Sequence, residues 1–341
     1  MRQSTVFVAL RSAPIALLGL ACFLLAPADR SARGADDAAL KQVSAAWQKR
    51  HEGVKSFQYE CALVCSLPKG SRTSIADRGN AKSHEEVPNK DAVLPGRFTF
   101  SLCGEKIAYS EEGEQWDDIS NSSRIMKIRA SFDTVYDRHL IEGAPYFPLG
   151  EITRGGKPCD TLTIHNNEMA LWLWFSPVAR LQRFRCPLEK MTVSQLHVSR
   201  DGHDCVEVSL PQSSLAWKIL IYADAARDYL PLQFVHQNNG RVTYDLSIQY
   251  VRDETVGWRV SAWSDKFFST SGAVARSSCY DVKRCSINKP LDDGVFAIEF
   301  PNGTHVIEKD RGAKTFFIVL ADGKRQYIPE REYGALPRGT K

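Results

Sequence analysis

The sequence lacks a strong excess of either charge. Its 44 lysines and arginines stand against 40 aspartates and glutamates, which gives a formal net charge of +4. No run of Lys and Arg stands out along the chain. So small an excess argues against nucleic acid and against a basic membrane-binding patch. We therefore expect no nucleic-acid partner.

The sequence also lacks an apolar run long enough to span a membrane. Residues 12–28 are nearly uncharged and follow Arg2 and Arg11, and they end in the small-x-small site Ala26-Pro27-Ala28. This run falls short of the roughly 18–20 residues of a spanning helix, and it is typical of a cleaved export signal. Residues 1–28 are therefore predicted to be a signal peptide. We expect a protein exported to the periplasm or cell envelope and soluble after cleavage.

A lipid anchor is the less favoured alternative for the same segment. Gly19-Leu20-Ala21 precedes Cys22, but Gly19 stands where a larger aliphatic residue is usual, and the apolar stretch continues past the cysteine. Cleavage after Ala28 removes two arginines and no acids, so the formal charge falls from +4 to +2. About 310 residues remain, enough for one large β domain or two smaller ones.

Catalytic and cofactor-binding motifs are missing as well. There is no Gly-x-Ser-x-Gly elbow, P-loop, His-Glu-x-x-His or dinucleotide fingerprint. His197 and His203 flank a turn at Asp201-Gly202 in a register that puts them on opposite sheet faces, so they are not expected to share a metal. The carboxylate pairs occur in turn-like sequence, where Asp bonds the backbone. We expect neither an enzyme nor a cofactor.

Cysteines, in contrast, are present in number. Of the nine in the chain, all but Cys22 lie in the exported part, and export permits disulfides. Cys61 and Cys65 are four residues apart in an expected strand, about 13 Å at ~3.3 Å per residue, which is too far for a bridge. Any disulfide must join distant segments. Buried reduced thiols are the open alternative.

The region from residue 36 to about 53 has helical periodicity. Asp36 and Asp37 are suited to open a helix, and Leu40, Val43 and Trp47 recur on one stripe. We expect one amphipathic helix that ends near Gly53.

Most of the remaining chain alternates polar and apolar residues between turns. Short strands without βαβ spacing predict an antiparallel sheet, with Asn238-Asn239-Gly240 as a hairpin turn. Residues 295–300 alternate in the same way and predict a late strand that Pro301 terminates. A last hairpin is expected about Asp322-Gly323. The apolar stretch 171–175 interrupts the pattern and predicts a short helix or loop that places aromatics in an apolar interior.

These features together suggest a family. The leader, the Trp-bearing helix, the meander with "IYADAARDYLPLQFVHQNNGRVTYDLSIQY" and the closing "FAIEFPNGTHV" resemble the LolA/LppX/RseB-like superfamily of exported bacterial proteins, which includes lipoprotein-sorting members. The resemblance spans roughly residues 38–306 and is strongest after residue 195. It implies a LolA-like half-open antiparallel barrel over 36–306, with helices on its concave face, and a C-terminal β-hairpin extension over 307–341.

The resemblance also implies an apolar cavity for a lipid or acyl chain. The side chains expected to line it come from the early strands, the apolar stretch and the late strand: Phe57, Tyr59, Leu63, Phe98, Phe100, Trp172, Trp174, Phe175, Phe296 and Ile298. The alternative is that they form a packed core.

Two departures from the family pattern stand out. Thr134 occupies a turn position where the family often has Gly, and the lid-contacting arginine of the lipoprotein carriers has no counterpart here. The function implied is binding, without catalysis, of a lipid or lipid-modified partner. An RseB-like regulatory or scaffolding module that acts by contact with an envelope protein is the alternative, with the last hairpin as an exposed edge for pairing.

Overall fold

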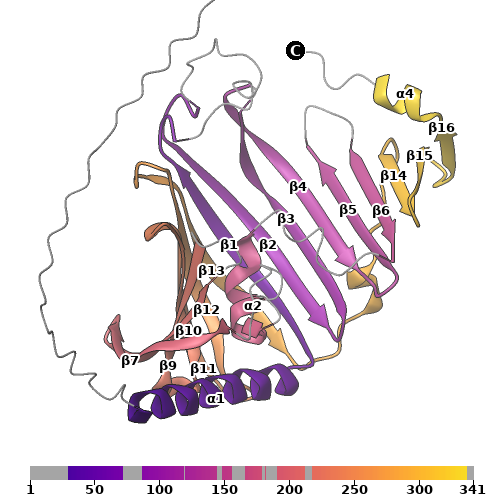
Figure 1. Cartoon of the computed structure of the whole chain (residues 1–341). Coiled ribbons are helices and arrows are strands. Elements are labelled where there is room, and N and C mark those ends of the chain that lie inside the picture. The colour runs from indigo at the N-terminus through magenta and orange to yellow at the C-terminus, as the bar shows by residue number, and fades with distance from the viewer. Residues whose placement is uncertain are drawn as a thin grey trace, which may run out of the picture.

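The computed structural model of the chain describes residues 30–71, 87–118, 120–143, 148–155, 166–178, 181, 190–211 and 217–335. Within these residues, sixteen strands form one continuous curved sheet. Helix α1 lies along one open end of the curve, and the short helix α2 lies in the hollow (Figure 1). The expected class, a mainly β half-open sheet with these two helical elements, is confirmed. No described helix is both long and apolar enough to cross a membrane.

The first half of the sheet is a meander in chain order. Each strand pairs antiparallel with the next, so the side chains of paired residues share a face. The strands are β1 (Ser56–Leu67), β2 (Ala92–Cys103), β3 (Lys106–Asp117), β4 (Ser122–Phe132), β5 (Tyr136–Glu142) and β6 (Leu149–Arg154).

The second half is another antiparallel meander that ends beside β1. Its expected turn is confirmed: Asn239 and Gly240 have φ of 50° and 74°, the left-handed pair that a two-residue hairpin requires. The strands are β7 (Thr192–Arg200), β8 (His203–Pro211), β9 (Trp217–Asp224), β10 (Leu230–Asn238), β11 (Arg241–Asp253), β12 (Gly257–Phe268) and β13 (Val274–Ile287). Pairing of β13 with β1 joins the two halves.

The C-terminal strands extend the first half. Strand β14 (His305–Asp310) pairs with β6 in parallel, and β15 (Ala313–Val319) and β16 (Arg325–Ile328) follow as a hairpin. The expected hairpin about Asp322-Gly323 is confirmed. It continues the same sheet, with β16 as one edge and β7 as the other, and the short helix α4 (Glu330–Ala335) follows it.

Helix α1 runs from Arg30 to Gly53, so it begins six residues before the predicted start. Asp36 and Asp37 therefore lie inside the helix. Gly34 costs only about 1 kcal/mol in a helix interior, which is too little to end it. The predicted stripe is confirmed, because Val43 and Trp47 are buried, and Trp47 Nε1 donates to the Tyr229 carbonyl at 2.7 Å.

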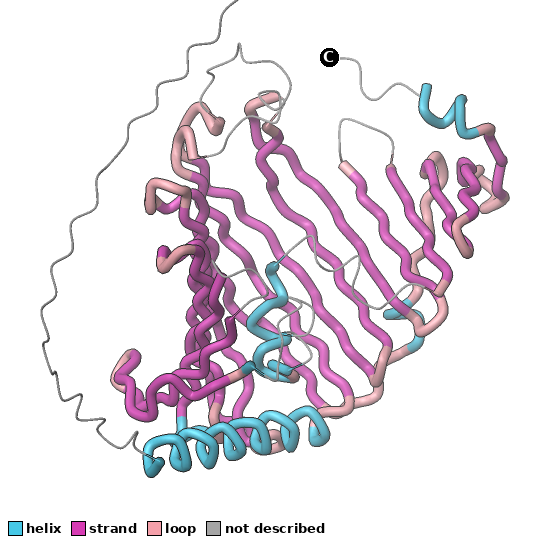
Figure 2. Tube along the Cα trace, in the orientation of Figure 1, coloured by secondary structure: helices cyan, strands magenta, loops and turns pink. Residues whose placement is uncertain are grey.

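Helix α2 (Met169–Phe175) carries the apolar stretch, and all seven of its residues are buried. It follows the one-turn helix η3 (Asn166–Glu168). Figure 2 shows both in cyan within the hollow, between the two halves of the sheet. A helix that is apolar on every side must be covered all round, and the curved sheet together with α1 provides that cover.

The predicted strand 295–300 is wrong. Residues 288–304, here called the outer segment, form the one-turn helix η6 (Asp293–Phe296) and then extended chain without strand pairing. The segment connects β13 to β14 across the outer face of the first meander (Figure 1). One side of it packs on that face while the other is in solvent. This arrangement produces the same alternation as a half-buried strand.

Candidate functional site

Eight of the ten predicted cavity residues meet in the hollow. Phe57, Tyr59, Leu63, Phe98 and Phe100 from β1 and β2 lie in one buried cluster with Trp172, Trp174 and Phe175 of α2. Their rings touch: the centroids of Phe57 and Trp174 are 5.7 Å apart, and those of Phe100 and Trp172 are also 5.7 Å apart. The structure therefore brings these eight together as a packed core.

The other two predicted residues lie on the opposite face, which corrects their placement. Ile298 borders a depression with Thr99 and Ser110, and these alternate along their strands with the inward Phe98 and Tyr109. Phe296 is buried beside Lys106, whose Nζ lies 6.0 Å from the ring centroid. The outer segment passes over this face, so neither side chain lines the hollow.

The packed core gives way to a polar network at the Asn167 end of α2. The Asn167 amide donates to Tyr109 Oη and to Glu111 Oε2, both at 3.0 Å, and accepts from Tyr280 Oη at 2.8 Å. Tyr109 donates to Glu111 at 2.5 Å, and Tyr280 contacts Asp265 at 3.2 Å. Asn167 thus links β3 of the first meander to β13 of the second, across the hollow.

Burial controls the ionisation of this network. It raises the pKa of Tyr109 and of Tyr280 well above their usual value. It also raises the pKa of Asp265, while the nearby positive charge of Arg276 acts in the opposite direction. Desolvation disfavours the charged form of each group. The network is therefore held by neutral phenols around buried carboxyl groups.

A cavity of about 260 Å³ opens beside the network, here called the concave cavity. Its apolar wall includes Leu63 and Leu94, and its polar wall includes Ser278 and residues of the network. The full lining is Leu63, Cys65, Leu94, Glu111, Glu114, Gln115, Trp116, Asn167, Arg276 and Ser278. At ~30 Å³ per water-sized group, it has room for roughly nine such groups.

Three polar side chains of this cavity have hydrogen-bonding groups without a partner among the described residues. The Nε and Nη2 groups of Arg276 and the Nε1 group of Trp116 are buried donors without an acceptor. Glu114, half-buried, takes part in no ion pair or hydrogen bond within the described part of the chain. Each buried donor left unpaired costs about 1–3 kcal/mol, so these groups are suited to meet a ligand.

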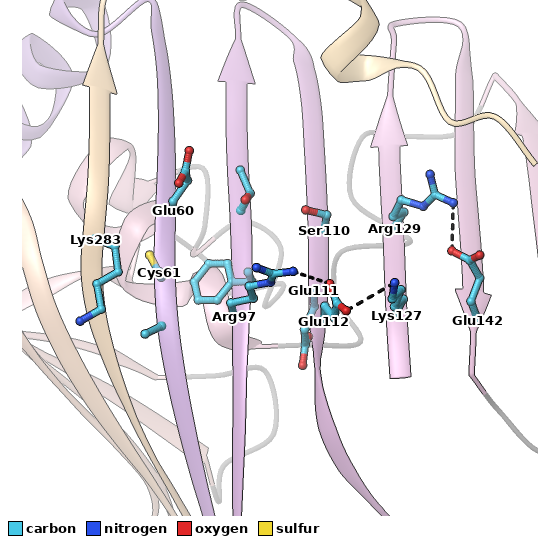
Figure 3. Close-up of a pocket in the computed structure, with 13 residues that line it drawn as sticks. Glu60, Cys61, Arg97, Ser110, Glu111, Glu112, Lys127, Arg129, Glu142 and Lys283 are labelled. Carbon is cyan, nitrogen blue, oxygen red and sulfur yellow. Dashed lines mark hydrogen bonds and ion pairs between the residues drawn. The ribbon is translucent and has the colours of Figure 1, made fainter. Parts of the chain in front are cut away.

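The outer face carries a larger depression of about 780 Å³, here called the outer groove. Small residues such as Thr99 and Ser110 form its floor, next to the outer segment. Its rim is charged with both signs: Glu60, Arg97, Glu112, Lys127, Arg129, Glu142 and Lys283. Figure 3 shows Arg97 and Lys127 directed at Glu112, at 2.8 and 3.4 Å, and Arg129 directed at Glu142, at 2.9 Å.

The histidines of the β7–β8 hairpin have separate carboxylate partners. His203 pairs with Asp224 at 3.2 Å, and His197 with Asp204 at 2.9 Å. Across the turn at Asp201-Gly202, Arg200 pairs with His203 and Val198 with Cys205, and the register shifts between Gln195 and Val198. Among the described residues, no group of three or more His, Cys, Asp and Glu side chains could hold a metal ion.

Six cysteines lie in the described part of the chain, and no disulfide joins any two of them: Cys61, Cys65, Cys103, Cys205, Cys279 and Cys285. Burial is the main cause that raises the pKa of Cys205 to about 11 and also raises that of Cys285. Such thiols are poor nucleophiles. Cys159, Cys186, Cys22 and the predicted signal peptide 1–28 lie outside the described residues.

Sequence reasoning missed the polar network and its cavity. One signal was present: Glu111 continues the inward series of Ile107 and Tyr109 in β3, and Arg276 and Ser278 share the series of Tyr280 in β13. A charged residue at an inward strand position is rarely buried unless it is paired with another polar group.

Several solved structures resemble this one at very low sequence identity. A DUF1329 family protein from Desulfovibrio piger matches at 9% identity over 76% of this chain and 96% of its own, with a TM-score of 0.45. A LolA superfamily protein from Nitrosomonas europaea matches at 11% identity over 75% and 97%, with a TM-score of 0.37. MucB in complex with MucA(peri) matches at 9% identity over 82% and 72%, with a TM-score of 0.18.

Comparison by sequence gives no relative. No protein-family model matches the chain, and no curated protein matches it either.

Proposed function

We propose that this protein is an exported, non-enzymatic binding protein that takes a lipid, or the lipid-modified part of a partner, on the concave side of its sheet. The observation that carries the proposal is the concave cavity. It lies where the apolar core beneath α2 meets the polar network, and its walls present Leu63 and Leu94 together with Arg276 and Asn167. Ligand sites typically combine apolar walls with a few placed polar groups.

The size of the cavity limits what enters without rearrangement. A volume of about 260 Å³ holds the polar end of a lipid and the first carbons of its chain, but not a whole acyl chain. The rest of a chain would follow the apolar face that α2 covers, so binding requires α2 to shift. Leu63 already lines the cavity, and the other seven packed residues named above would contact the ligand only after α2 has shifted.

The test has two parts. Protein purified from its own envelope is analysed by native mass spectrometry and by organic extraction for a co-purifying lipid. Purified protein is then titrated with a fluorescent fatty-acid probe. Leu94→Trp should fill the cavity and weaken probe binding. Val93→Trp is the matched control, because Val93 is next to Leu94 in the sequence but its side chain is 66% exposed, while that of Leu94 is 4% exposed.

The result that would overturn the proposal is equally concrete. A protein that carries no lipid and binds the probe equally well in the Leu94→Trp and Val93→Trp variants does not use this cavity.

A regulatory or scaffolding function through protein contact is the second candidate, and the outer groove favours it. Its rim offers arginine and lysine beside glutamate, which suits a polar protein surface. The β16 edge, where Tyr327 is 61% exposed, offers a strand for pairing. Crosslinking in envelope extracts should then capture a stoichiometric partner, and Arg97→Glu with Lys127→Glu should abolish the capture.

A further inference from the structure

The concave cavity contains two opposite charges that do not pair with each other. Arg276 is on β13 and Glu114 is on β3, in the two halves of the sheet, and both line the cavity. No ion pair joins them, and Glu114 has no other partner in the described part of the chain. Glu112, which is also on β3, forms ion pairs with Arg97 and Lys127.

Arg276 is held in place without being neutralised by an ion pair. Its guanidinium carbon lies 4.3 Å from the ring centroid of Phe267, a cation–π contact that fixes its position. Asp265 is near enough for its carboxyl to respond to the Arg276 charge, yet two of the Arg276 N–H groups have no acceptor within the described residues. An anionic oxygen in the cavity would supply one.

Glu114, on the other wall of the cavity, is suited to bind a cationic group of the ligand. It lines the cavity together with Glu111, whose carboxylate already accepts from Tyr109 and Asn167. A purely anionic ligand would meet repulsion from Glu114, and a purely cationic ligand would meet repulsion from Arg276. A ligand that carries both charges is favoured on both walls.

The lining also includes large apolar side chains. Leu63 and Leu94 are inward residues of β1 and β2, and Trp116 adds a large apolar surface with one N–H donor. These side chains would contact carbon atoms next to the charged groups. The room for roughly nine water-sized groups corresponds to a compact two-charge headgroup with a short apolar continuation.

We infer that the concave cavity is a headgroup site for a zwitterionic amphiphile, with Arg276 binding its anionic group, Glu114 its cationic group, and Leu94 and Trp116 its first apolar carbons. The inference rests on the proposed function and specifies the class of lipid. A single-chain phospholipid with an ethanolamine headgroup has this chemistry.

The experiment compares three amphiphiles with single apolar chains of the same length, each used below its micelle-forming concentration: lysophosphatidylethanolamine, the anionic lysophosphatidylglycerol, and an alkyltrimethylammonium cation. Their dissociation constants for the full-length mature protein are measured by displacement of a fluorescent fatty acid and by native mass spectrometry. Wild type should prefer the zwitterion over each of the other two by about tenfold or more, the effect of one charged hydrogen bond.

Two variants give the decisive readout, because each should remove one of the two preferences rather than weaken the binding of all three amphiphiles alike. Glu114→Gln should remove the preference over the anionic amphiphile, and Arg276→Met should remove the preference over the cationic one. Glu112→Gln is the matched control, because Glu112 lies on the same strand but is bound by Arg97 and Lys127 in the outer groove, and it should leave all three affinities unchanged. If Arg276→Met fails to fold, Glu114→Gln, at a half-buried position, decides alone.

The outcomes separate the two proposals. If none of the amphiphiles binds, both the proposed function and the headgroup site are wrong. If all three bind equally well, or if Glu114→Gln leaves the ratio of affinities unchanged, lipid binding stands and the zwitterion site is wrong. Loss of probe binding in the Glu112→Gln control would also contradict the assignment, because it would place the charge recognition on the outer face.

Discussion

The ring of Phe300 lies directly on the backbone of Gly150. A Cβ atom at position 150 would come within 2.6 Å of the ring and 3.0 Å of Val306, closer than real side chains approach. Both neighbours belong to a small buried cluster on the outer face, with Ile152 and Phe317. The outer segment can therefore pack on β6 only because residue 150 has no side chain.

Gly150→Ala should destabilise the protein by about 1–3 kcal/mol, the usual cost of overpacking. Urea denaturation measures it. Gly53→Ala is the control, since a Cβ there meets nothing within 4 Å, and it should be neutral or slightly stabilising because alanine favours helix. A Gly150→Ala variant as stable as wild type would mean that Phe300 does not rest on β6.

Thr134→Gly should stabilise the protein. Thr134 has φ of 84°, a conformation that is costly for a β-branched residue, and the turn is held by Asp133, which accepts from the Val135 and Tyr136 amides at 2.9 and 2.8 Å. Relief of strain is worth roughly 1–2 kcal/mol, and part of it is lost to the greater freedom of glycine when unfolded. We expect a net gain of up to ~1 kcal/mol by thermal denaturation.

Thr134→Ala serves as the comparison for this turn, since alanine keeps the Cβ atom. It should gain less than glycine. An equal gain for both would show that the β-branch, and not the backbone angle, is the source of the strain.

Asp265→Asn should change how stability depends on pH. Burial raises the pKa of Asp265 in the folded protein above the ~3.9 of an unfolded chain, so the folded state binds the proton more tightly. The contribution of this group is then most favourable below pH ~4 and declines as pH rises through the folded pKa. The amide has no proton to lose, so the stability of the variant relative to wild type should rise with pH.

Denaturant unfolding at several pH values from about 4 to 8 measures this difference. Asp281→Asn is the control, because its side chain is 62% exposed, and it should show little such trend. A relative stability of Asp265→Asn that falls with rising pH would contradict the prediction.

Trp174 and Trp172 should respond differently to truncation. Trp174 is fully buried, donates to the Trp258 carbonyl at 2.9 Å and contacts Phe57 and Tyr59, so Trp174→Ala should cost about 3–5 kcal/mol. For Trp172→Ala we predict a smaller loss of stability together with weaker binding of a fatty-acid probe. Melting temperature and probe affinity are measured for both. Two badly destabilised proteins, or unchanged probe binding, would leave α2 as an ordinary core helix.

The strand pattern was predictable because each meander strand has one face in the core. In β11, Tyr244, Leu246 and Ile248 are buried while their neighbours are not. The alternation of apolar and polar residues in the sequence predicts this one-sided burial. The same signal failed at Phe296 and Ile298. The side of residues 295–300 that is covered packs on a sheet formed by other strands, and alternation does not reveal whether a segment joins a sheet or lies on one.

The candidate site was less predictable than the fold. The aromatic side chains of β1, β2 and α2 were grouped correctly, because apolar residues at inward positions converge on one core. The cavity residues Glu114, Asn167 and Arg276 come from three elements far apart in the sequence, and only the pairing of β1 with β13 brings them together. No local pattern contains that pairing.

The parallel pairing of β14 with β6 has a consequence for the order in which the chain can fold. A chain that emerges from its N-terminal end first exposes β1 and β6 as unpaired edges, because their partners β13 and β14 lie near the C-terminal end. Both edges stay unpaired until almost the whole polypeptide has been synthesised. During that time they can pair with other chains, so slow or interrupted synthesis should favour aggregation, and the edge of β6 is the last to be protected.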